Sequence, residues 1–177
     1  MNIFLNTKYI PKLIVNNKYF KCQIGKNGIV PIYKKKEGDG CTPFGKWKLN
    51  NIYFRSDKSI SLKFKTHLKK KVFPIKNTYI WCDDVNSSLY NKFFKKKSYE
   101  QELSYTYENL FRKDEIYDII IELNYNQNPT IKKKGSAIFI HCSSAKFKST
   151  LGCVALKKNH LKFLINNLQK ENYIYIR

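Results

Sequence analysis

Apolar residues along this chain come in short runs, and most of the runs have the length of a β-strand. The first two runs, residues 12–15 and 19–24, are separated by Asn16 and Asn17. Two apolar runs joined by a short turn of this composition are typical of a β-hairpin. Gly25 and Gly28 follow and predict a second turn.

Three later runs and the carboxyl terminus continue the strand pattern. Residues 78–84 and 116–126 are candidates for buried strands, and residues 172–177 form a final strand. The segment 135–141 is apolar at consecutive positions, as expected for a central strand that is covered on both faces.

Helical spacing is clear in one segment. Apolar residues recur at Leu161, Leu164, Ile165 and Leu168, and Asn159 is placed to cap the start of this helix. A second helix is predicted over residues 99–111.

Glycine, proline and lysine dominate the stretches between these elements. Residues 34–49 are expected to form a loop with a sharp reversal, and residues 50–76 to form surface strands or an excursion. No repeat or low-complexity linker divides the chain. We therefore predict one domain over residues 1–177, mainly β (α+β), with one or two packed helices.

Charge changes the picture of possible partners. The formal net charge is +21, from 34 Lys and Arg against 13 Asp and Glu. Such a surface attracts nucleic acid, anionic lipid or an acidic wall polymer, although an AT-rich genome would also inflate the lysine content. No known nucleic-acid-binding motif is present, no apolar run is long enough for a transmembrane segment, and the amino terminus is a poor signal peptide. Three alternatives follow: the protein stays inside, it is exported by another route, or its true start lies upstream.

The candidate chemistry lies in the stretch IFIHCSSAKFKSTLGCVAL, residues 138–156. His141 ends one apolar run, and Cys153 begins the next. A thiol with a pKa near ~8.5 needs a base or a positive field to act as a nucleophile, and neighbouring strands would bring these two side chains together. The amides of Leu151, Gly152 and Cys153 would then face a developing oxyanion. The alternative is a buried structural cysteine beside a hydrogen-bonded histidine.

The other cysteines do not suggest metal chemistry. None of the five forms a C-x-x-C pair, so we expect no metal and no cofactor. Strand alternation points the side chain of Cys142 away from that of His141, which predicts a place in the core.

These motifs resemble the catalytic domain of the L,D-transpeptidases (YkuD type). The segments WCDDVNSSLYN, FRKDEIYDIIIELNYN and GSAIFIH look like a proteobacterial branch of this family. His141, Thr150, Gly152 and Cys153 match its His and Ser/Thr-x-Gly-Cys pattern, and the segments GKNGIVP and EGDGCTPFGKWKL resemble its upstream strands. The resemblance covers about residues 12–176. It implies a twisted β-sandwich-like fold and acyl transfer on peptidoglycan stem peptides, which would place the protein in the periplasm.

The resemblance also implies roles for single residues. Cys153 would attack the peptide carbonyl, His141 would carry the proton, and the backbone carbonyl of Cys142 would hold the imidazole. Leu151 and Ala155 differ from the commoner branch, which has histidine at the first position and often arginine or asparagine at the second. Cross-linking and hydrolysis by the same cysteine and histidine therefore both stay open.

Further residues are candidates for substrate contacts. Ser143, Ser144 and Lys146 lie in the loop that follows His141. Asp39 would bind a free amine, unless it only supports its turn. Arg112 would bind a carboxylate, unless it pairs with Asp114. A basic nucleic-acid-binding module remains the alternative from another functional class.

Overall fold

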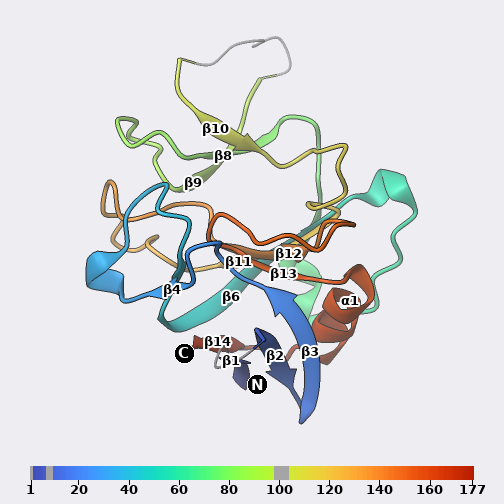
Figure 1. Ribbon diagram of the computed structural model, residues 1–177. Coiled ribbons are helices and arrows are strands. Elements are labelled where there is room, and N and C mark those ends of the chain that lie inside the picture. The colour runs from blue at the N-terminus through green and yellow to red at the C-terminus, as the bar shows by residue number, and fades with distance from the viewer. Residues whose placement is uncertain (1, 7–9, 98–103) are drawn as a thin grey trace.

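The computed structural model describes residues 2–6, 10–97 and 104–177, and short strands dominate it (Figure 1). The strands are β1 (Asn2–Asn6), β2 (Lys12–Val15), β3 (Lys18–Gln23), β4 (Ile29–Val30), β5 (Thr42–Pro43), β6 (Gly45–Phe54), β7 (Val72–Pro74), β8 (Tyr79–Cys82), β9 (Lys92–Lys95), β10 (Tyr107–Asn109), β11 (Ile119–Leu123), β12 (Phe139–Cys142), β13 (Val154–Leu156) and β14 (Tyr173–Ile176). The helices are α1 (Lys158–Asn167) and the 3₁₀ turns η1 (Ile32–Lys34), η2 (Ser56–Lys58) and η3 (Thr66–Lys71). The predicted mainly β fold is confirmed.

The main sheet closes on itself. Its strand order is β11-β12-β13-β3-β2-β1-β14-β6-β7, and β6 also pairs with β11. The long strand β6 makes this closure possible because its first half pairs with β14 and its second half with β11 and β7. Strand pairing thus wraps around the interior, as in a twisted sandwich.

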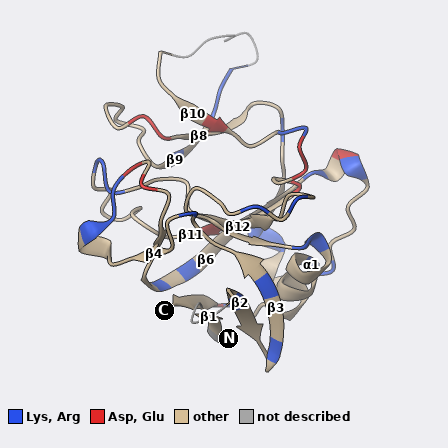
Figure 2. Cartoon of the chain, viewed as in Figure 1, with Lys and Arg blue, Asp and Glu red and all other residues tan. Residues whose placement is uncertain are grey.

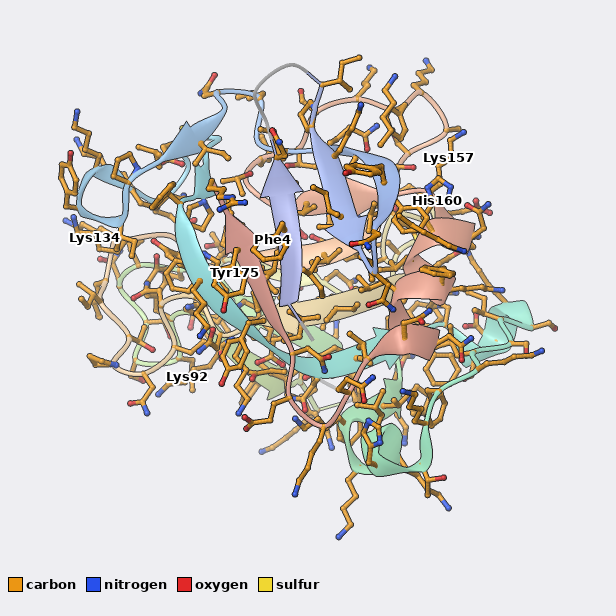
Figure 3. The ribbon with its side chains drawn as sticks, turned by 90° about the horizontal axis from the view of Figure 1, so that it is seen from below. Phe4, Lys92, Lys134, Lys157, His160 and Tyr175 are labelled. Atoms are coloured by element: carbon orange, nitrogen blue, oxygen red, sulfur yellow. The ribbon has the colours of Figure 1, made fainter. Side chains whose placement is uncertain are left out.

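The parallel pair β1–β14 joins the two ends of the chain. Phe4 lies opposite Tyr175, and the two rings stack with centroids 5.1 Å apart (Figure 3). Ile3 and Leu5 on the other face of β1 are fully buried. No element was predicted for residues 2–6, because polar residues flank this short apolar stretch.

Two apolar cores lie on the two faces of the β11–β12 pair. Ile119, Ile121 and Ile140 belong to the larger core inside the closed sheet, which α1 also covers. Ile120 and Phe139 belong to a second, aromatic core with residues of the small sheet β10-β8-β9. Consecutive apolar residues are therefore needed on these strands, as the sequence predicted for 135–141 and 116–126.

Helix α1 buries Leu161, Leu164 and Ile165 as their spacing predicts, but the predicted cap is wrong. The helix begins at Lys158, with Lys157 at the N-cap position and no side-chain cap. Asn159 lies inside the first turn, where its side-chain oxygen accepts a bond from the amide of His160.

Two further predictions need correction. The helix predicted over residues 99–111 is wrong where the structure describes it, because Tyr107–Asn109 pairs with β8 as a strand; residues 98–103 lie outside the described part. The loop predicted over residues 34–49 is partly strand, because β5 begins at Thr42 and β6 begins at Gly45. Pairing with β14 outweighs the weak strand propensity of this glycine-rich and lysine-rich stretch.

No helix in the described residues is long and apolar enough to cross a membrane.

Candidate active site

His141 and Cys153 are brought together by the parallel strands β12 and β13. The register pairs His141 with Ala155, so the two side chains lie on one face of the sheet. Cys153 precedes Ala155 by two positions and therefore shares that face, diagonally across from His141. Both residues line one cavity.

The Cys153 thiol lies in a half-buried backbone niche. Its Sγ accepts a hydrogen bond from the Phe139 amide at 3.3 Å and donates to the Ala137 carbonyl at 3.2 Å. Burial raises the pKa of this thiol to about 12, against the opposing effect of the Phe139 amide. The thiol is therefore protonated at neutral pH.

The His141 imidazole is buried and fixed in place. Its Nδ1 lies 2.8 Å from the Cys142 carbonyl oxygen, and Tyr117 packs edge-on against the ring with centroids 5.4 Å apart. Burial lowers the pKa of His141 to about 4. The ring is thus neutral at pH 7, and because Nδ1 donates to the carbonyl, Nε2 is left as the proton acceptor.

Thr150 organises the loop before the cysteine. Its Oγ1 donates to the Cys153 carbonyl at 2.6 Å and accepts from the Gly152 amide at 3.1 Å. The amides of Leu151 and Cys153 donate to no acceptor among the residues that the structure describes. Two of the three amides considered for an oxyanion are thus available, while the third is already engaged.

Gly152 is required by both conformation and space. Its φ is +145°, and a Cβ there would lie 2.9 Å from the Cys41 carbonyl oxygen and 3.2 Å from Cδ1 of Ile138. The loop that carries Cys41 therefore packs directly against the backbone beside the thiol.

The cavity has a volume of about 590 Å³. Eight residues named in the sequence analysis line it: Arg112, Asp114, His141, Ser144, Thr150, Leu151, Cys153 and Ala155. Asp39, Cys142, Ser143, Lys146 and Gly152 do not line it. Cys142 is buried in the larger core, as strand alternation predicted.

Arg112 reaches the cavity with its guanidinium already paired. Asp114 accepts from Nε at 3.0 Å and from Nη2 at 2.6 Å, and Glu108 lies 3.4 Å from Nη1. Burial raises the pKa of Glu108, and the nearby Asp83 carboxylate adds to this effect, while Arg112 opposes it.

Asp39 supports its own turn. Its carboxylate accepts from the amides of Lys36 at 2.8 Å and Cys41 at 2.9 Å, and it pairs with the Lys35 ammonium at 2.7 Å. It is Lys35, not Asp39, that lines the cavity.

Several lining residues were not predicted, among them Lys35, Glu108, Tyr117 and Ser136. Tyr117 and Ser136 belong to segments that were interpreted only as strands. Glu108 fell within the wrongly predicted helix. The four-residue spacing of Glu108 and Arg112 was the one available signal for their pairing.

The family model of the L,D-transpeptidase catalytic domain (YkuD) matches residues 5–176. The chain belongs to this family. The L,D-transpeptidase domain is thus of a type that modifies peptidoglycan peptides. No curated protein matches the chain.

Proposed function

We propose that this L,D-transpeptidase domain is a cysteine acyltransferase that cross-links peptidoglycan stem peptides through a thioester on Cys153. The observation that carries the proposal is the shared face of β12 and β13, where the Cys153 thiol and the His141 imidazole line the same cavity. Family membership supports the substrate class.

In the first step, the Cys153 sulfur attacks the carbonyl between the diamino acid of the stem and the terminal residue. The thiol proton passes to Nε2 of His141 and then to the leaving amine as the amide bond breaks. Since the resting pair is neutral, the thiolate forms only as the sulfur attacks. The free amides of Leu151 and Cys153 stabilise the oxyanion.

In the second step, the amine of a neighbouring stem attacks the thioester and His141 takes up its proton. A new amide forms, the carbon–sulfur bond breaks, and the thiol is restored with the proton from His141. Water attacking in place of the amine would give hydrolysis. The acceptor molecule, amine or water, therefore decides whether the stem peptide is cross-linked or shortened. The substrate lies outside the inner membrane, and we place the reaction in the periplasm.

Muropeptide analysis of purified sacculi tests this proposal. We expect incubation with the protein to produce new L,D cross-linked species, and Cys153→Ala to produce none. Cys142→Ala is the matched control, because that thiol lies in the core on the opposite face. Shortened stems without new cross-links would show a hydrolase, and unchanged muropeptides would refute both activities.

A further inference from the structure

Lys35 is the one fully buried lysine among the described residues, and it lines the catalytic cavity. Its side chain is 3% exposed, whereas the other lysines in the described part of the chain stay in contact with solvent. Burying an ammonium group costs free energy unless the group is fully paired. An incompletely paired buried lysine therefore indicates a site for a negatively charged ligand.

The hydrogen bonds of Lys35 leave one donor unused. Its Nζ donates to Asp39 at 2.7 Å and to the Lys36 carbonyl at 2.9 Å. An ammonium carries three N–H groups, and no third acceptor lies within reach among the described residues. The turn does not depend on this cation, because the Asp39 carboxylate already accepts from two backbone amides.

The segment beside Lys35 is polar. Ser136 is 7% exposed, its Oγ is buried, and it lies close enough to the Tyr90 hydroxyl to oppose the rise in the pKa of Tyr90. The Tyr90 hydroxyl donates to Glu37. Lys35 Nζ approaches this segment closely, since a Cβ on Gly135 would lie 3.0 Å from it.

The half-buried guanidinium of the cavity, on Arg112, is already neutralised. Arg112 is held by Asp114 and Glu108, so a further carboxylate there would meet two carboxylates around one guanidinium. By contrast, the carboxylate that pairs with Lys35 lies behind the cavity wall, because Asp39 does not line the cavity.

We propose that Lys35 binds the terminal carboxylate of the residue that leaves during acyl transfer. This inference rests on the proposed function. Lys35 is close enough to Cys153 for its charge to lower the pKa of the thiol. The carboxylate of a chain-terminal residue is two bonds from the nitrogen of the scissile amide, so it falls in the same region. The subsite makes the enzyme select free chain ends.

Binding of two stem tetrapeptides to the Cys153→Ala protein tests the subsite. One peptide ends in a free carboxylate and the other in a carboxamide. By calorimetry, we expect the acid to bind about 10- to 100-fold more tightly, the range for a charge-assisted hydrogen bond. Adding Lys35→Met should bring the two affinities within a few-fold of each other, whereas Lys36→Met should leave the preference intact.

A double variant separates binding from folding. Lys35→Met with Asp39→Asn removes both charges and leaves no unpaired carboxylate, and it should also abolish the preference. Equal loss of binding for both peptides, a preference near one in the Cys153→Ala protein, or no binding of either peptide overturns the subsite. If the preference holds but sacculi stay unchanged under the wild-type protein, the proposed function fails and the subsite stands.

Discussion

At the scale of single residues, the site combines a protonated thiol with a neutral imidazole. Burial accounts for both, since it raises the pKa of Cys153 and lowers that of His141. Such a pair is inert until a substrate arrives, because the charged form of each residue is disfavoured. The proposed mechanism therefore requires substrate binding and the free amides of Leu151 and Cys153 to favour proton transfer from the thiol to His141 together.

Acid should destabilise the fold through His141. The pKa of this residue is about 4 when folded and about 6.5 otherwise. Between these pH values the unfolded chain takes up a proton that the folded protein does not, so stability falls as the pH drops from 6.5 to 4. The loss is roughly 3 kcal/mol. Urea unfolding at several pH values should show this loss in the wild type but not in His141→Gln.

His67→Gln is the control for this experiment, because it makes the same substitution at an exposed position away from the cavity. Parallel pH profiles for the wild type and His141→Gln would contradict the assigned burial of a neutral ring.

A methyl group at position 152 should be poorly tolerated. Gly152→Ala combines a positive φ with a contact of 2.9 Å to the Cys41 carbonyl oxygen. Gly28→Ala is the matched control, since φ there is +81° and nothing lies within 4 Å. We expect Gly28→Ala to cost about 1 kcal/mol in the free energy of unfolding and Gly152→Ala about 2–4 kcal/mol, with loss of acyl transfer. Equal costs for the two variants would show that the loop carrying Cys41 moves aside to accommodate the methyl group.

At the scale of elements, a buried carboxylate held by two partly exposed lysines fixes the segment that enters β11. The Asp118 side chain is fully buried, and its carboxylate pairs with Lys58 at 2.9 Å and with Lys158 of α1 at 2.7 Å. Its neighbour Tyr117 packs against His141. The contact between helix and strand therefore also positions the His141 ring.

Removing the Asp118 carboxylate should destabilise the fold more than removing the exposed carboxylate of Glu115. Asp118→Asn removes the charge-assisted contacts of a fully buried side chain with two partly exposed lysines and should lower the free energy of unfolding by about 1–3 kcal/mol. Glu115→Gln removes only the 3.8 Å and 4.0 Å contacts of a 67% exposed carboxylate and should cost less than about 0.5 kcal/mol. Chemical denaturation of both variants decides this, and similar losses would rule out the larger role of the Asp118 carboxylate.

Elements with a regular apolar pattern were predictable, and elements defined by their partners were not. The hairpin of β2 and β3, the buried strands β11 and β12, and helix α1 all follow from local spacing. β6 begins in a glycine-rich and lysine-rich stretch, and β10 carries Glu108, so their strand character comes from β14 and β8. Residues such as Lys35 and Ser136 reach the cavity only through that tertiary arrangement.

At the scale of the whole molecule, charge is distributed unevenly. Lys and Arg are spread over the loops and strands of the exterior (Figure 2). The cavity is lined by four of the 13 acidic residues, Glu37, Asp83, Glu108 and Asp114, but by only three of the 34 basic ones, Lys35, Arg112 and Lys148. The exterior is thus suited to an anionic polymer, while the cavity is nearly balanced.

This distribution predicts that salt weakens attachment to the wall without altering the chemistry. Binding of the Cys153→Ala protein to sacculi in a sedimentation assay should fall steeply between about 50 mM and about 500 mM NaCl, because exposed charges are screened. The reactivity of Cys153 toward a small neutral alkylating agent should not change. Salt-independent sedimentation would show that the positive charge plays no part.

The central claim is that Cys153 is the nucleophile, and covalent trapping tests it most directly. A carbapenem carries a strained amide that opens when a thiolate attacks its carbonyl. Intact-protein mass spectrometry after incubation should show one adduct on the wild type and on Cys142→Ala, none on Cys153→Ala, and peptide mapping should place it on Cys153. An adduct that persists in Cys153→Ala would contradict the account.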